Sequence, residues 1–321
     1  MGRQDGGLSM KDLIKRICRP CGALTDNFII ATILSVILIL IGTMISLPIM
    51  QYSGIKNWAA DYLQSDNLSA FFQDYLSFIG IWIVILLAAV IPKKNRPMLK
   101  AFLHNRKGNN LRGVIAGILL GFGTNGFCVL MSVLMGDIKL SFYGFRPGIL
   151  LLFVVAVFIQ SGAEELADRF YLYQKLRRRY RSPLVAIIVN AVVFMLLHVL
   201  NPGFTVVAGS QILLIGLIFS LLVYYYNSLW AAMWFHMARN YTQNIIFGLP
   251  NSGIVSEFSI FKLEAASATS GLFYDVKFGV EGSIGASLLL VLILILLILI
   301  NRDRPECVDC WAEAEANAAA K

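Results

Sequence analysis

The sequence predicts an all-α, polytopic membrane protein, and three observations lead to that prediction. Apolar residues make up 58% of the 321 residues and charged residues only 14%, whereas soluble domains average about 45–50% apolar and about 25% charged. Several apolar stretches reach the roughly 20 residues that a helix needs to cross a bilayer. These stretches are continuous rather than alternating, which excludes a transmembrane β-barrel. The composition therefore excludes an ordinary soluble enzyme, a disordered chain and a small disulfide scaffold.

Eight membrane-spanning helices are predicted, and together they form one transmembrane domain, residues 28–301. The first span follows a polar segment, residues 1–27, and is long enough to serve as a signal anchor rather than a cleaved signal peptide. The second span is short and the seventh is rather polar, whereas the others are long apolar runs. In chain order the predicted spans are Phe28–Met50, Leu76–Ile91, Gly113–Met135, Gly148–Tyr173, Pro183–Leu200, Val206–Tyr226, Ser228–Gly248 and Ser283–Ile300.

The distribution of basic residues predicts the orientation of these helices. Of the 27 Lys and Arg residues, 20 fall in residues 1–27, in the segments that follow the second and fourth spans, and in residues 302–321, and Arg169 near the end of the fourth span brings the number on this side to 21. The positive-inside rule places those segments, and therefore both termini, in the cytoplasm of a cell-membrane protein. The basic excess, a net charge of +8, is explained by this orientation. No nucleic-acid partner is expected, and the oligomeric state is left open.

Ionisable side chains inside the spans are the strongest indication of function, because each costs a few kcal/mol in a bilayer. They gather in three of the eight spans, and two of the chain's three histidines are among them. The set consists of Glu164, Glu165, Asp168 and Arg169 in the fourth span, His198 in the fifth, and His236 and Arg239 in the seventh, where the polar but uncharged Asn240 accompanies them.

Helical spacing predicts how some of these side chains meet. Glu165 and Arg169 are four residues apart and can form an ion pair on one face of the helix, which leaves Glu164 to point elsewhere. Glu164 lies 17 positions before Arg181, in the basic turn, and His198 lies 17 positions after it. The two side chains therefore fall at one depth of an antiparallel hairpin, an arrangement typical of a general base or a metal ligand.

Three motifs lie in order on these helices: EExxxR at 164–169, FxxxH at 194–198 and HxxxN at 236–240. Each is weak alone, but the ordered trio resembles the CPBP family of intramembrane proteases, also called ABI or CAAX protease-like proteins. That family includes the type II CAAX prenyl endopeptidase and bacterial proteins linked to bacteriocin processing and self-immunity. The resemblance covers residues 148–248, which would form the protease-like core.

The resemblance implies an endopeptidase that hydrolyses a membrane-associated or lipid-modified peptide. Glu164 and His198 would activate a water molecule, and His236 and Asn240 would polarise the peptide carbonyl and stabilise the oxyanion. Glu165 and Arg169 would act as an orienting pair. The active site is expected in a polar cavity that opens to the cytoplasm. Either a zinc ion held by Glu164, His198 and His236 or a metal-free glutamate mechanism fits these residues.

Other functional classes compete with this interpretation. A non-catalytic immunity or scaffold protein that binds a peptide or a membrane partner would carry the same helices, and Glu165 and Arg169 alone are as well explained by a structural ion pair. A transporter is disfavoured by the lack of inverted repeats. The sequence contains no HExxH, GxSG-type or GxGD segment, which disfavours other classes of intramembrane protease.

Two CxxC pairs flank the transmembrane domain, Cys18 with Cys21 and Cys307 with Cys310. Both lie on the predicted cytoplasmic side, where a reducing environment disfavours disulfides. Together they could hold a structural zinc ion that joins the two terminal segments. The alternative is that they are free thiols near the membrane surface.

Overall fold

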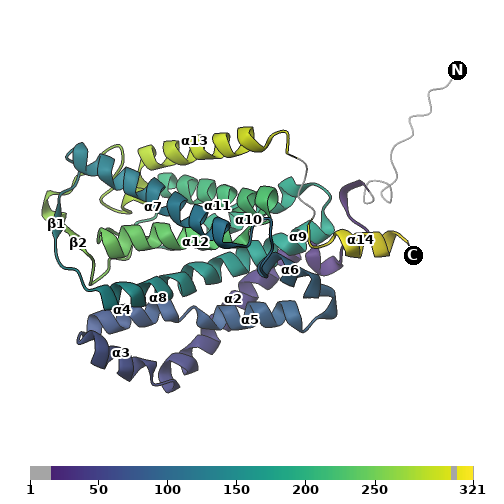
Figure 1. The fold of residues 1–321 in the computed structure, drawn as a ribbon, viewed down its shortest axis with the longest axis horizontal. Coiled ribbons are helices and arrows are strands. Elements are labelled where there is room, and N and C mark those ends of the chain that lie inside the picture. The colour runs from purple at the N-terminus through teal and green to yellow at the C-terminus, as the bar shows by residue number, and fades with distance from the viewer. Residues whose placement is uncertain (1–15, 305–308, 321) are drawn as a thin grey trace.

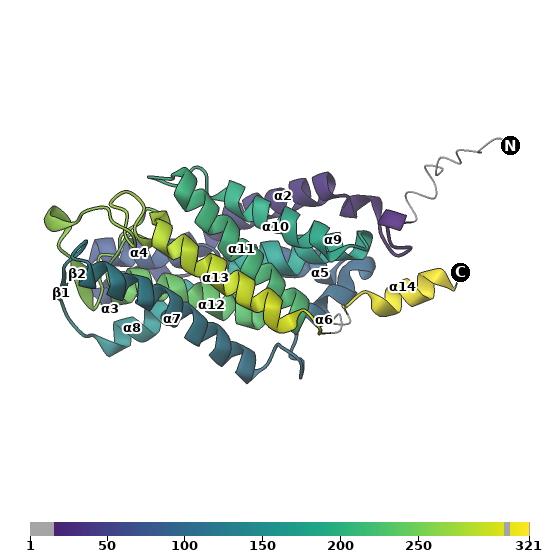
Figure 2. The same cartoon turned by 90° about the horizontal axis from the view of Figure 1, so that it is seen from above.

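The computed structural model describes residues 16–304 and 309–320, which are mostly helical. The long helices run side by side in an elongated bundle, with the small β1–β2 sheet at one end and α9 and α14 at the other (Figures 1 and 2). In the first half of the chain the elements are η1 (Leu24–Asp26), α2 (Phe28–Tyr52), α3 (Ile55–Leu63), α4 (Asp66–Leu76), α5 (Ile79–Val90), η2 (Lys93–Met98), α6 (Leu99–Phe102), α7 (Leu111–Leu134) and β1 (Leu140–Phe142).

The second half of the chain contains the three motif-bearing helices. Here α8 continues through the turn η3 into α9, and α12 continues into the turn η4. The elements are α8 (Pro147–Glu165), η3 (Leu166–Leu172), α9 (Tyr173–Arg179), α10 (Pro183–Leu197), α11 (Val206–Tyr226), α12 (Leu229–Tyr241), η4 (Thr242–Ile246), β2 (Phe261–Leu263), η5 (Ala265–Ser267), η6 (Val280–Gly282), α13 (Ile284–Asn301) and α14 (Ala312–Ala319).

Six helical segments of the described chain are long and apolar enough to cross a membrane, so this is a multi-pass membrane protein. Two of the eight predicted spans fall outside that set. The fifth corresponds to α10, which is apolar but only 15 residues long, and the seventh is the polar α12 with η4. The six segments are Phe28–Tyr52, Asp66–Val90, Leu111–Leu134, Pro147–Arg179, Val206–Tyr226 and Ile284–Asn301.

The helix α12 lies inside the bundle, where it packs against α7 and α8. Glycines on α7 allow this close approach. A Cβ atom at Gly117 would lie 2.5 Å from the Ala231 carbonyl oxygen, and one at Gly121 would lie 2.5 Å from the Ala238 Cβ. Small residues at such contacts are a common means of packing membrane helices. The consequence is that α12 presents His236 and Asn240 to the interior of the protein.

The helices α8 and α12 each widen into a π-helical turn at or just after their motif, and η3 itself contains Arg169. The turn η3 begins after Glu165, and η4 begins two residues after Asn240. In η3 the carbonyl oxygens find partners on other helices: that of Ala167 accepts from the Ser35 hydroxyl, and that of Asp168 accepts from the Asn190 side chain at 2.6 Å. Such single wide turns occur frequently at functional sites.

Parts of both terminal segments dock on the basic helix α9. Asp26 binds Arg178 at 2.5 Å and Lys175 at 2.9 Å, and Asp309 binds Arg177 at 3.0 Å. Burial by itself would raise the pKa of the Asp26 carboxyl, but its hydrogen bonds and ion pairs with Arg178 and Lys175 hold that pKa below its usual range. Trp311 is fully buried against the same helix. We call this cluster of Asp26, Lys175, Arg178, Asp309 and Trp311 the α9 junction.

Candidate active site

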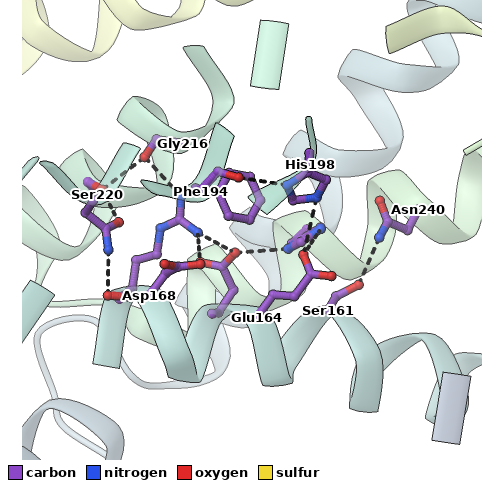
Figure 3. A network of polar contacts seen from close by, with 12 residues as sticks. Ser161, Glu164, Asp168, Phe194, His198, Gly216, Ser220 and Asn240 are labelled. Atoms are coloured by element: carbon purple, nitrogen blue, oxygen red, sulfur yellow. Dashed lines mark hydrogen bonds and ion pairs between the residues drawn. The ribbon is translucent and has the colours of Figure 1, made fainter. Parts of the chain in front are cut away.

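The structure brings Glu164, His198 and His236 together from α8, α10 and α12. The Glu164 Oε2 atom lies 3.8 Å from His198 Nε2 and 3.7 Å from His236 Nε2. Figure 3 shows the imidazole ring of His198 facing Glu164, with Asn240 and Ser161 beside it. The meeting of Glu164 and His198 agrees with their equal spacing from the basic turn. His236 reaches the same point only because of the depth at which α12 lies. The equal spacing of Glu164 and His198 from Arg181 does not determine that depth.

The hydrogen bonds of the two histidines define which nitrogen of each ring carries the proton. His198 Nδ1 lies 2.8 Å from the Phe194 carbonyl oxygen, and a carbonyl oxygen can only accept. His236 Nδ1 lies 2.9 Å from Glu165 Oε1. Both rings therefore donate through Nδ1, and in their neutral form they present Nε2 as an acceptor towards Glu164 Oε2. Three acceptors converge on one point, an arrangement that suits a molecule with two hydrogens to donate, such as water.

Glu165 and Arg169 form the predicted ion pair, and both side chains are fully buried. Arg169 Nη1 donates to Glu165 Oε1 at 3.0 Å, and Arg169 Nη2 donates to the Gly216 carbonyl oxygen at 3.2 Å. The Arg169 guanidinium also lies over the Phe194 ring, 4.3 Å from its centre. The positive charge of Arg169 pairs with the Glu165 carboxylate inside the protein. Glu165 is therefore suited to hold His236 in position.

Two further polar residues, which none of the three motifs includes, join the site. Gln160 donates to Glu164 Oε1 and accepts from Asn240 Nδ2 at 3.2 Å. Ser161 accepts from the same Asn240 nitrogen at 3.2 Å. Both residues lie one turn before Glu164, in an otherwise apolar run, and that polar interruption is the signal that would have found them. The expected contact of Asn240 with an oxyanion stays a prediction, because its amide donates to these two residues here.

The site opens into a cavity of about 370 Å³. The residues of its apolar wall come from α2, α5, α10 and α11, and other lining residues are polar. Lining residues such as Asn201, Ser252 and Glu281 belong to segments expected on the face opposite the basic loops, and no described basic segment contributes a lining residue. The lining therefore does not support the expected access from the cytoplasm. The apolar wall includes Ile39, Ile81, Leu197, Ile212 and Ile215.

Two imidazoles and one carboxylate are a donor set that suits catalytic zinc. In the part of the chain that the structure describes, however, no group of three or more His, Cys, Asp or Glu side chains is arranged closely enough to hold a metal ion. The spacing of Glu164, His198 and His236 thus does not match a zinc site, although their chemistry does. Zinc at these residues stays a prediction, and no step below depends on it.

The described cysteines, Cys18, Cys21, Cys128 and Cys310, are free thiols, and Cys307 lies outside the described residues. Cys21 Sγ donates to the Arg178 carbonyl oxygen at 3.5 Å, and Cys310 Sγ donates to Gln174 Oε1 at 3.3 Å. Both CxxC pairs thus reach α9 through one member. Burial raises the pKa of the Cys21 and Cys310 thiols, which keeps them protonated in the absence of a metal. The four-cysteine zinc site stays a prediction.

Comparison with known proteins agrees with the geometry. Residues 146–242 match the family model described as type II CAAX prenyl endopeptidase Rce1-like. The matched segment contains all three motifs, from Glu164 to Asn240. No curated protein and no solved structure matches the chain.

Proposed function

Because this chain belongs to the CAAX protease-like family through residues 146–242, we propose that it is an intramembrane endopeptidase whose active site is built on Glu164 and His198. The observation that supports this most directly is the position of Glu164 Oε2 between the Nε2 atoms of His198 and His236. That oxygen is buried and has no hydrogen-bond partner among the described residues. A carboxylate oxygen left without a partner in a membrane protein is costly, which favours a chemical role over a structural one.

In the proposed reaction Glu164 acts first as a base and then as an acid. A water molecule donates one hydrogen to Glu164 Oε2 and the other to His198 Nε2. Glu164 removes a proton from this water as its oxygen attacks the peptide carbonyl carbon. When the tetrahedral intermediate collapses, the C–N bond breaks and Glu164 returns the proton to the leaving amine. His198 is kept in the required tautomer by the Phe194 carbonyl oxygen.

His236 and Asn240 are proposed to stabilise the oxyanion of the intermediate. With its proton on Nδ1, His236 can donate through Nε2 only as an imidazolium ion, and the carboxylate of Glu165 stabilises that ion from the other side of the ring. Asn240 lies one turn further along α12. Its amide makes two contacts of 3.2 Å, with Gln160 and Ser161, and it can exchange one of them for the substrate oxygen.

The cavity supports a peptide substrate that is attached to the membrane or carries a lipid. Its apolar wall can hold an aliphatic chain, while its polar end holds the residues that act on a peptide bond. The alternative is an immunity or scaffold protein that binds a peptide or a membrane partner in the same cavity without cleaving it.

Cleavage of internally quenched peptides by purified protein in detergent tests this proposal. Glu164→Ala and His198→Ala are each expected to lower the rate by about 10²- to 10⁴-fold. The matched control is His104→Ala, which removes the third histidine from an exposed position on the loop before α7 and should leave the rate unchanged. Equal cleavage by wild type, Glu164→Ala and His198→Ala would show that the catalytic assignment is wrong. A partner that co-purifies with both Glu164→Ala and wild type, without cleavage, would support the scaffold alternative.

The proposed location is the cell membrane, with both termini in the cytoplasm. The docking of residues from both terminal segments on α9 supports their placement on one side of the membrane. Fusion of a topology reporter to each terminus tests this. Reporters that give opposite locations would contradict it.

A further inference from the structure

Arg239 lies in the wall of the active-site cavity, and the reaction proposed above does not use it. It follows His236 by three residues on α12, and it is only 5% exposed. Its guanidinium makes no hydrogen bond to any residue in the described parts of the chain. Its one ion pair there is a long contact, 3.8 Å from Nη2 to Glu281 Oε1. A buried guanidinium normally uses most of its five N–H donors, so this side chain is unusually open to a ligand.

Glu281 neutralises Arg239 without covering it. The other oxygen of Glu281 accepts from the Ser252 backbone N–H at 2.9 Å and from the Ser252 hydroxyl at 3.4 Å. These bonds hold the carboxylate on the loop side, at a distance where it supplies charge but no direct hydrogen bond. The charge of Arg239 is thus tolerated inside the protein, while its donors remain available.

The space behind Arg239 is too small to satisfy these donors. A void of about 10 Å³ lies between Arg239, Asn125 and Gln211, which is room for about one water molecule. The Gln211 amide, buried in the same wall, also lacks a partner among the described residues, so this water would be shared. Arg239 also lines the main cavity, as Glu164 does, so a ligand in that cavity can reach the remaining donors.

We propose that Arg239 binds a carboxylate of the peptide substrate. A carboxylate is the group of a peptide that matches the planar, two-pronged donor face of a guanidinium. Three residues of α-helix separate Arg239 from His236, an axial rise of about 4.5 Å. The anchored carboxylate is therefore within a few residues of the scissile bond, either at the chain end or on an acidic side chain. This inference names a substrate class for the proposed peptidase and rests on that function.

Peptide binding, measured without cleavage, tests the proposed contact between Arg239 and a substrate carboxylate, here called the anchor, separately from catalysis. The probe is one labelled apolar pentapeptide made in three forms: a free acid, a carboxamide, and a carboxamide with one glutamate. Binding to Glu164→Gln protein is followed by fluorescence anisotropy in detergent. At least one carboxylate form should bind about tenfold or more tightly than the plain carboxamide. Preference for the free acid identifies the chain end, and preference for the glutamate form identifies the side chain.

Variants of Arg239 and Glu281 then test whether Arg239 causes the preference for a carboxylate peptide. Adding Arg239→Gln should abolish it, adding Glu281→Gln should increase it, and adding Arg146→Gln, which changes an exposed arginine before α8, should leave it unchanged. Because Arg239→Gln leaves Glu281 unpaired, the double change Arg239→Gln with Glu281→Gln serves as a charge-neutral variant, and it too should lose the preference. Equal binding of all three peptides, absent binding of both carboxylate forms, or a preference that survives both Arg239 variants overturns the proposal. Carboxylate-selective binding by a wild-type protein that cleaves nothing would contradict the proposed function and leave the anchor in place.

Discussion

His236 donates a hydrogen bond from Nδ1 to Glu165 Oε1 at 2.9 Å, so the second glutamate of one motif positions the histidine of another. The same oxygen accepts from Arg169 at 3.0 Å. Glu165 and Arg169 are therefore more than a structural pair, because together they fix the ring orientation and the tautomer of a residue that lines the cavity. This bond, the α9 junction and the CxxC pairs lead to four predictions.

Glu165→Gln should lower the cleavage rate by about 10²-fold while the protein still folds. A glutamine can accept from His236 but carries no charge to stabilise an imidazolium ion. Peptide cleavage at saturating substrate measures the effect, and circular dichroism checks the fold. A rate equal to that of wild type would show that Glu165 does not act through His236.

Arg169→Met should destabilise the protein by about 3–5 kcal/mol, because it leaves the buried Glu165 carboxylate without its counter-ion. The double change Glu165→Leu with Arg169→Met removes both charges and should recover much of that stability, yet remain inactive. Thermal unfolding in detergent compares the variants. If the double variant is no more stable than Arg169→Met, the pair contributes little to the fold.

Asp26→Asn should destabilise the protein at neutral pH, by about 3–5 kcal/mol for a broken buried ion pair. The pKa of Asp26 is lower in the folded state than the usual value of 3.8, so its contribution is complete above that usual value and is lost as the pH falls through the lowered one. The difference between wild type and Asp26→Asn should therefore shrink on acidification below about pH 4. Asp303→Asn, at an exposed position, is the control and should show no difference at either pH. A difference between wild type and Asp26→Asn that stays constant with pH would contradict the assigned ion pairs.

The proposed four-cysteine zinc site predicts a metal stoichiometry. Purified wild-type protein should contain one zinc per chain, and Cys18→Ser should lose it, whereas Cys128→Ser, which changes a buried thiol of α7, should keep it. Elemental analysis measures this directly. Unchanged zinc content in Cys18→Ser would leave the thiols as free cysteines.

Most of the fold was predictable because each membrane-spanning helix requires an apolar run of about 20 residues, which is visible in the sequence. The spans that correspond to α2, α7, α11 and α13 agree with the structure to within a few residues. The second span begins ten residues earlier than predicted, at Asp66, because α4 is amphipathic and not a continuous apolar run. The long span Pro147–Arg179 also extends past its predicted end at Tyr173, through residues whose charges are neutralised by the terminal segments. Hydropathy cannot show such tertiary contacts.

The active site likewise has some contacts that the sequence predicts and others that it does not. The ion pair of Glu165 with Arg169 and the meeting of Glu164 with His198 follow from helical periodicity and the hairpin. The bond between His236 and Glu165 joins α8 to α12, whose relative rotation depends on glycine packing between α7 and α12 and not on a local pattern. The roles of Gln160 and Arg239 depend likewise on which way each helix faces. Such contacts across the bundle require the packed structure.

The π-helical turn η3 separates two parts of one long helix: α8, which carries Glu164, and α9, which binds the terminal segments. A π turn holds one residue more than an α turn, which shifts the angular phase of everything beyond it by about 100°. Glu164, before η3, lines the cavity, while the arginines after η3 face Asp26 and Asp309 of the terminal segments. In an uninterrupted α-helix these two faces would be locked at a different angle. A one-residue deletion in η3 would therefore rotate α9 away from the terminal segments, while the residues of α8 would keep their orientation.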